Sequence, residues 1–211
     1  MTTIDPNTVS LFRDSAHIPD HYWEDLAVLK PEEVCLRAQV TFQEGQGYGL
    51  PFLNCFYSCL PDARKIQLRS DPEKPLSFQR VLVLLVYLLK SLDLPLTGKK
   101  INEREIPGGD LFFRGPHALL KEPLEKKFAQ DPQGFLQAGI DQGGQPTGKG
   151  EASFELSVLP RIPVEYIFYG ADEEFPAQLL IHFDSTVHRH LPLDVIWAMI
   201  NITGRTLLKK E

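Results

Sequence analysis

Residues 156–200 read LSVLPRIPVEYIFYGADEEFPAQLLIHFDSTVHRHLPLDVIWAMI, and this stretch decides the fold of the chain. From residue 152 to residue 158, every second side chain is apolar, which is the period of a strand with one solvent-exposed face. Residues 164–169 are rich in β-branched and aromatic side chains, which predicts a second strand. Residues 177–183 alternate between apolar and polar side chains except at Leu180, which predicts a third strand that is covered on both faces. Short turns join the three strands, which predicts an antiparallel meander.

Prolines mark the limits of these elements. Pro160 and Pro163 interrupt the ladder between the first two strands, because neither can donate a backbone hydrogen bond. Pro192 suits the first turn of a helix, and apolar residues then recur at helical spacing as far as Ile200. Gly204 can end that helix. The meander is therefore expected to be followed by a closing helix.

The N-terminal half predicts a second meander. Residues 34–42 alternate between apolar and polar side chains, which predicts a strand. Three glycines at 45–49 turn the chain, and we predict further strands at 50–60 and 64–68. Ahead of this meander, Asp20 can cap a short helix.

Residues 81–89, VLVLLVYLL, are nine consecutive apolar residues. A helix that is apolar on all sides belongs in the middle of a domain, and Ser77 can cap it. A buried strand is the alternative, because short apolar runs fit both structures. Residues 118–129 and 132–140 predict two short helices.

The predicted fold class is therefore α+β. Two antiparallel β-meanders pack with a buried central helix and a C-terminal helix. Residues 1–19 are polar and interrupted by proline, and we predict an N-terminal arm there. Residues 20–211 are expected to form a single α+β domain, because a chain of this length can bury a sizeable core without crosslinks.

Composition excludes several classes of protein. The net charge is −6 and the pI is about 5.5, so neither nucleic acid nor an anionic membrane is expected as a partner. The apolar run at 81–89 is far shorter than the roughly 20 residues that a membrane-spanning helix needs. There is no signal-peptide pattern, and the three cysteines are an odd number. A reducing, cytoplasmic location is the simplest interpretation.

Two motifs favour ordinary structure over chemistry. Residues 143–150, GGQPTGKG, have the glycine and lysine spacing of a phosphate-binding loop. The hydroxyl residue that would bind magnesium is absent, and the loop precedes a strand where such loops precede a helix. Cys55 and Cys59 are about 13 Å apart in an extended strand, so they are expected to be buried thiols and not a metal pair.

The strongest candidate site is the corner formed by His182, Asp184, His188 and His190. His182 and Asp184 fall on one face of a strand, and the other two histidines follow shortly after. Imidazole and carboxylate groups at short separation suit a divalent transition metal, or a general base with an orienting partner. The alternative is that Asp184 caps the following turn while the histidines are solvated.

Three adjacent carboxylates, Asp172, Glu173 and Glu174, lie on the turn before the last strand. A calcium loop would need more oxygen ligands at fixed spacing. No calcium site is expected here. Instead, we predict a ligand pocket between the sheet and the helices, with these three residues, His182 and Asp184 at its rim. Solvated turn residues are the alternative.

Three blocks resemble a known family: residues 83–113 (VLLVYLLKSLDLPLTGKKINEREIPGGDLFF), residues 159–192 (LPRIPVEYIFYGADEEFPAQLLIHFDSTVHRHLP) and the closing helix. The family is an uncharacterised prokaryotic domain of unknown function, frequent in anaerobes. His188 and His190 are outside its pattern. Some relatives are fused to iron–sulfur domains similar to those of corrinoid proteins, but this chain lacks the four closely spaced cysteines of such a cluster.

The resemblance implies a cytoplasmic protein of an anaerobe, with an iron–sulfur or corrinoid protein as partner. The leading functional hypothesis is non-catalytic binding of a small molecule or cofactor, linked to metal or corrinoid metabolism. One alternative is a metal-dependent enzyme that uses His182 and Asp184. The other is a protein–protein adaptor.

Overall fold

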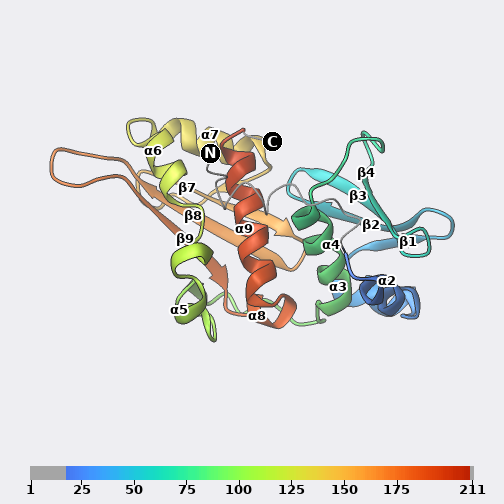
Figure 1. Cartoon of the computed structure of the whole chain (residues 1–211). Helices are drawn as coiled ribbons and strands as arrows, with labels where there is room; N and C mark the ends of the chain where they lie inside the picture. The colour runs from blue at the N-terminus through green and yellow to red at the C-terminus, as the bar shows by residue number, and fades with distance from the viewer. Residues whose placement is uncertain (1–17, 210–211) are drawn as a thin grey trace, which may run out of the picture.

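The computed structural model describes residues 18–209, so residues 1–17 of the predicted arm lie outside the described range. Its helices are α2 (Asp20–Ala27), α3 (Pro31–Ala38), α4 (Phe78–Lys90), α5 (Gly109–Phe112), a 3₁₀ turn (Gly115–His117), α6 (Glu122–Phe128), α7 (Pro132–Asp141), α8 (Val187–His190) and α9 (Leu193–Leu207). Its strands are β1 (Thr41–Gln43), β2 (Gly47–Phe52), β3 (Cys55–Leu60), β4 (Lys65–Leu68), β5 (Lys100–Asn102), β6 (Gln145–Pro146), β7 (Ala152–Leu159), β8 (Ile162–Tyr169) and β9 (Gln178–Asp184). Figure 1 shows two sheets with α4 and α9 between them.

The first meander is an antiparallel sheet in the order β1-β2-β3-β4. The prediction of a strand at 34–42 is wrong, because its larger part forms α3. Val34 and Ala38 are four residues apart, so they share a face in a helix as well as in a strand. Pro31 starts the helix, and Leu36, which the strand pattern would bury, is exposed. A period of two over so short a stretch cannot exclude a helix.

The apolar run at 81–89 is helical, as predicted. The side chain of Ser77 accepts a hydrogen bond from the Arg80 amide, so Ser77 is the N-cap of α4. Eight of the 13 residues of α4 are buried, including Val83 to Leu88 without a break, because α9, α2 and α3 all pack against it. The Tyr87 hydroxyl donates to the Ala38 carbonyl oxygen at 2.8 Å and fastens α4 to the end of α3.

The second meander is larger than predicted, with strands in the order β5-β9-β8-β7-β6. Two short strands, β5 and β6, extend the three predicted strands at either edge. Pro163 does not interrupt the ladder, since it lies inside β8 opposite Ser157. The following helix is also longer than predicted. Gly204 lies within α9 and not at its end, and its missing side chain leaves room for Leu120.

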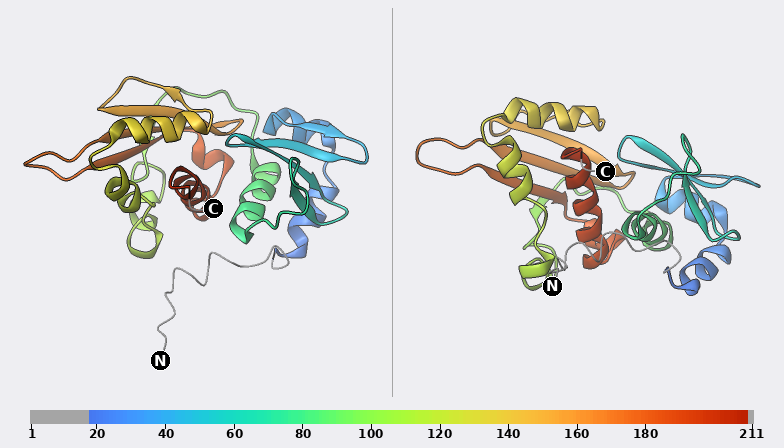
Figure 2. Two further views of the ribbon diagram at one scale, coloured as in Figure 1. Left: turned by 90° about the horizontal axis from the view of Figure 1, so that it is seen from above. Right: turned by 45° about the horizontal axis from the view of Figure 1, so that its top comes forward.

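The two faces of this sheet differ in chemistry. The face that packs against helices carries apolar rows such as Phe154, Tyr166 and Ile181, which are direct cross-strand neighbours. Helix α7 lies close against it, because a side chain on Gly139 would collide with the Phe154 ring. Figure 2 shows α6, α7 and α9 on this side and loop segments on the other. The second face is consequently the one available for polar chemistry.

The α+β fold with two antiparallel meanders, a buried central helix and a C-terminal helix is confirmed. The two sheets meet where the Leu53 amide donates to the Val158 carbonyl oxygen at 3.0 Å. A single domain over residues 20–211 stays a prediction. Ile18, assigned to the arm, is buried and not free. Within residues 18–209, the helices are too short or too polar to span a membrane.

Candidate functional site

The predicted corner does not converge on one point. Asp184 is buried, and its carboxylate accepts hydrogen bonds from the Thr97 and Gly98 amides at 3.2 and 2.7 Å. It also accepts from the Thr186 amide at 3.1 Å and from the Thr186 hydroxyl at 2.8 Å. These donors occupy the oxygens that a metal would use. The structure therefore favours the alternative, in which Asp184 holds the turn after β9 and the loop before β5.

The three histidines of the corner have separate surroundings. His182 lies half-exposed on β9, with its Nδ1 3.7 Å from Glu165 Oε2. His188 and His190 lie on α8, where the Nδ1 of buried His190 accepts from the Leu92 amide at 3.2 Å. Within residues 18–209, no three His, Cys, Asp or Glu side chains are arranged to hold a metal. Asp184 and His190 thus hold the loops on either side of α8 through backbone amides, whereas His182 lies beside Glu165 on the open face.

His190 is expected to make the protein acid-sensitive. Burial lowers the pKa of its imidazole, and the charges of Arg161, Arg189 and His188 lower it further. The charge of Asp184 acts in the opposite direction. The unfolded chain therefore binds a proton at a higher pH than the folded chain does. Stability should fall as pH drops below about 6.5, by at most about 1.4 kcal/mol per pH unit.

The variant His190→Asn keeps an acceptor near the Leu92 amide and removes the titration. Urea unfolding between pH 5 and 8 should show a flatter pH profile for this variant than for the wild type. Equal slopes in the two proteins would contradict a role for His190.

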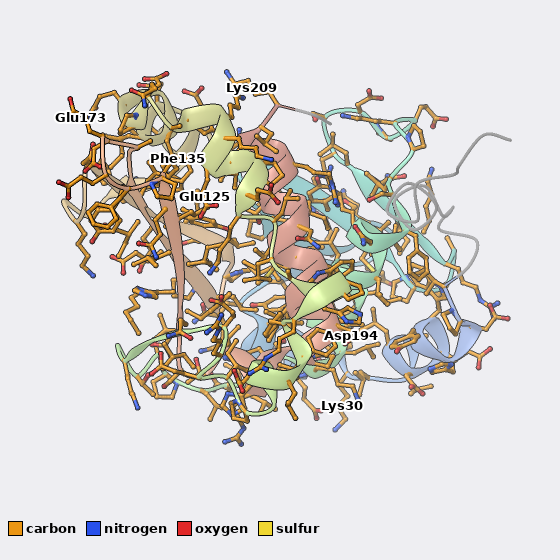
Figure 3. The ribbon with its side chains drawn as sticks, turned by 60° about the vertical axis from the view of Figure 1, so that its left-hand side comes forward. Lys30, Glu125, Phe135, Glu173, Asp194 and Lys209 are labelled. Carbon is orange, nitrogen blue, oxygen red and sulfur yellow. The ribbon has the colours of Figure 1, made fainter. Side chains whose placement is uncertain are left out.

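The acidic turn lies apart from the corner, at the outer end of the β8–β9 hairpin. Figure 3 shows Glu173 at the edge of the molecule. Asp172 Oδ1 accepts from the Glu174 and Phe175 amides at 2.8 and 2.7 Å, and these hydrogen bonds lower the pKa of Asp172. Asp172, Glu173 and Glu174 are all exposed. They lie on the turn beyond the last paired residues of the hairpin, Tyr169 and Gln178, whereas His182 is paired with Glu165 within the sheet.

A continuous polar row crosses the open face of the large sheet. Direct cross-strand pairing aligns one residue from each strand: Gln145 on β6, Glu155 on β7, Glu165 on β8, His182 on β9 and Asn102 on β5. On this face of the sheet, loops cover the positions on both sides of the aligned residues. Thr97 and Gly98 hold Asp184 on one side of the row, and the link at 147–151 lies over Ile167 on the other. We call these five residues, with Lys100 and Lys149, the polar row.

Glu165 is the centre of the polar row. Its side chain is only 2% exposed, yet both carboxylate oxygens contact Lys149 Nζ, at 2.9 and 3.0 Å. Burial raises the pKa of Glu165, but the hydrogen bond and charge of Lys149, with the charge of Lys100, outweigh it. The pKa of Glu165 is therefore lowered, and a buried carboxylate stays ionised beneath cationic side chains.

Lys100 explains how the row is covered. It lies on β5, yet its ammonium group forms an ion pair with Glu155 on β7, two strands beyond its neighbour β9. Strands are about 4.8 Å apart, so the Lys100 and Glu155 side chains extend toward each other and together bridge β9 and β8. Two glutamates opposite each other repel. The ammonium groups of Lys100 and Lys149 offset that repulsion and lie together on the open face.

The glycine-rich link supplies one of these lysines. Lys149 of the GGQPTGKG segment pairs with Glu165, and its backbone amide donates to the Ser153 hydroxyl at 2.6 Å. The segment is thus a strap over the sheet. Cys59 is buried, which raises the pKa of its thiol, while Cys55 is exposed. All three cysteines are free.

Sequence reasoning missed Glu165, Lys149, Lys100 and Glu155. One signal was present: Glu165 is a carboxylate within IPVEYIFY, a strand that is otherwise apolar or aromatic. A charge in such a position needs a partner, because an unpaired buried charge is very costly. The partners themselves could not be found, since they are distant in sequence and meet only through strand register.

Surface depressions occur elsewhere. One of about 520 Å³ is lined by Glu122, Pro123, Lys126, Lys127 and Leu208. A smaller one of about 230 Å³ is lined by residues 64–66, 72–76 and Val81. Neither includes a residue of the polar row.

Comparison with known proteins adds a family but no activity. The model of DUF3786, a domain of unknown function, matches residues 30–206. No curated protein and no solved structure matches the chain significantly.

Proposed function

The chain belongs to the DUF3786 family, and from this premise we propose that it is a small-molecule-binding domain whose ligand presents an anionic group to the polar row. The family carries no assigned activity, so the proposal rests on the side chains of the open sheet face. The observation that supports it most is the buried, ionised Glu165 beneath Lys149, Lys100 and His182.

The hydrogen-bonding capacity of the row favours an anion. The carboxylates of Glu165 and Glu155 already accept from lysine ammonium groups. Each ammonium group has three N–H donors, and the side chain of Lys149 is 52% exposed. The unused capacity is therefore mainly that of donors, from the two lysines and the half-exposed His182. A carboxylate or phosphate group fits such a surface.

The row supports binding more than catalysis. A metal-dependent enzyme at His182 and Asp184 has little support, because hydrogen bonds already occupy the Asp184 carboxylate. His182 beside Glu165 resembles a base with an orienting carboxylate, but the open surface offers no means to exclude water. We therefore assign His182 to ligand contact.

The link to metal or corrinoid metabolism in an anaerobe is part of the same proposal. Cys35, Cys55 and Cys59 are too few for an iron–sulfur cluster of the usual four thiolates, so such a cluster would belong to a partner. A corrinoid such as cobalamin carries a phosphate group that the two lysines could bind. Cobalamin is accordingly one of the probes in the experiment below.

The test is calorimetric titration of the purified protein with inorganic phosphate, citrate and cobalamin. We expect at least one of them to bind, and Lys149→Met to weaken that binding about tenfold or more, since a hydrogen bond to a charged group contributes about 1.5–3 kcal/mol. The matched control is Lys65→Met, an exposed lysine on a strand of the other sheet. Its affinity should equal that of the wild type.

Two results would contradict the proposal. One is the absence of measurable binding by all three probes to the wild type. The other is equal weakening by Lys149→Met and Lys65→Met, which would indicate nonspecific attraction of anions. If Lys149→Met alone loses affinity and its circular dichroism is unchanged, the ligand binds at the polar row and not at another lysine-rich surface.

A further inference from the structure

The β8–β9 hairpin projects from the body of the molecule, and its outer end combines acidic and aromatic side chains. Figure 1 shows this hairpin extending past α6. Phe175 is 66% exposed, and Tyr169 at the base of the hairpin is 41% exposed. Exposure of a large aromatic ring on a projecting turn is unfavourable in water, which is typical of a contact surface.

The turn is held in one shape before any contact is made. The two amide hydrogen bonds to Asp172 Oδ1, and the Asp172 amide bonded to the Phe175 carbonyl oxygen at 3.0 Å, fix residues 172–175. Asp172 is therefore occupied, and Glu173 and Glu174 supply the outward charges. A preorganised turn loses little conformational entropy on docking.

A complementary hollow lies on the same chain, beside α6. It is the depression of about 520 Å³ lined by Glu122, Pro123, Lys126, Lys127 and Leu208. Pro123 supplies partly exposed apolar surface, with Leu208 buried at 6% exposure beneath it, and the lysines outnumber the single carboxylate. Lys126 pairs with Glu122 at 2.5 Å, but both side chains are exposed, so this ion pair contributes little to stability. Lys126 can therefore exchange Glu122 for a carboxylate of another molecule.

We infer that two copies of this chain associate, with the hairpin tip of each copy in the α6 hollow of the other. Phe175 would pack on Pro123 and Leu208, while Glu173 and Glu174 face Lys126 and Lys127. This occupant is favoured because the hollow matches the tip in both its apolar and its charged parts.

The positions of tip and hollow allow both contacts at once. The base of the hairpin is bonded to α6 and the residues after it, through the Leu179 amide on Glu125 Oε1 at 2.8 Å and the Ala171 amide on the Ala129 carbonyl oxygen at 2.8 Å. Tip and hollow therefore flank the same helix. A two-fold axis beside α6 would make the two contacts equivalent and close the assembly as a dimer.

Sedimentation equilibrium of the whole chain from 5 μM to 1 mM tests this inference. The wild type should form dimers that dissociate as salt rises, because the contact is partly ionic. The double variant E173K/E174K should weaken dimerisation at least tenfold, and F175S should do the same. The matched control E44K/D62K makes an equal charge change on exposed hairpin turns of the small sheet and should dimerise like the wild type.

Charge exchange identifies the contacting surface. K126E/K127E, or K126E alone if the double variant unfolds, should also weaken dimerisation. Mixing the E173K/E174K protein with the K126E/K127E protein should restore association, as a heterodimer. The new lysines on the tip of one protein then face the new glutamates in the hollow of the other, a contact of reversed polarity. A wild type that stays monomeric at 1 mM overturns the inference, as does a dimer that survives F175S and E173K/E174K or a mixture that fails to associate.

Discussion

Replacing Arg161 with methionine should lower the free energy of unfolding by about 3–5 kcal/mol, the largest effect that we expect from one substitution. The Arg161 side chain is 10% exposed and lies in the β7–β8 turn. Its Nε donates to the Arg37 carbonyl oxygen at 2.8 Å, and its Nη2 donates to the Leu36 carbonyl oxygen at 3.1 Å. These carbonyls belong to the last turn of α3, where no helical amide can satisfy them.

The same guanidinium joins parts of the chain that are distant in sequence. Its Nη1 donates to the Leu94 carbonyl oxygen at 3.0 Å, and its Nη2 pairs with Asp93. The Arg161 amide donates to the Tyr87 hydroxyl at 3.1 Å. One side chain thus connects the large sheet, the small sheet's helix α3 and the loop after α4. Methionine keeps the volume of the stem but leaves three carbonyl groups unpaired.

Guanidinium chloride unfolding measures the effect. The control is Arg114→Met, which removes an exposed guanidinium that pairs with Asp110 one helical turn away and should change stability little. If Arg161→Met and Arg114→Met had equal midpoints and slopes, the hydrogen bonds of Arg161 would not hold the two sheets together.

The sequence predicted an element correctly wherever that element was long and its hydrophobic pattern fitted only one kind of secondary structure. Strand β7 alternates from Ala152 to Val158, and α4 combines nine apolar residues with a capping serine. Burial of one strand face, or of a whole helix, leaves that periodicity in the sequence directly. The α+β fold class follows from these elements together, since two meanders need helices to cover their apolar faces.

Short elements and long-range pairs could not be predicted in the same way. Residues 34–38 satisfy both periodicities, and only Pro31 distinguished the helix. The polar row depends on strand register: Glu155, Glu165 and His182 are far apart in the chain yet direct neighbours in the sheet. His182 was selected because it is a histidine on a strand, but its partner proved to be Glu165 and not Asp184. The short turns predict that these three strands are neighbours, but the spacing of residues does not give the register that aligns Glu155, Glu165 and His182.

Replacing Asp184 with alanine should lower the free energy of unfolding by about 2–4 kcal/mol near neutral pH, without any dependence on added metal. The carboxylate is the common acceptor for the amides of Thr97, Gly98 and Thr186. Removing it leaves those donors unpaired at the junction of β9, β5 and α8. If Asp184 were instead a metal ligand, the wild type should lose the same stability when a chelator is added.

The pH dependence separates a capping carboxylate from a merely polar side chain. Burial raises the pKa of Asp184, but hydrogen bonds from Thr186, Thr97 and Gly98 outweigh it and leave the pKa lowered. A carboxyl group whose pKa is lower in the folded state stabilises the protein above the ordinary value of about 3.9, and this stabilisation is lost as pH falls below it. The gap between wild type and Asp184→Asn should therefore be full at pH 6 and narrow towards pH 3.

The matched control is Asp194→Ala, which removes an exposed carboxylate in the first turn of α9. Its carboxylate bonds only the neighbouring Val195 amide at 2.9 Å, so its loss should cost about 1 kcal/mol or less. A gap for Asp184→Asn that stayed constant from pH 6 to pH 3 would mean that ionisation of Asp184 does not stabilise the fold. Asp184 would then hold the loops at 97–99 and 185–187 only as a polar side chain, through hydrogen bonds that do not need its charge.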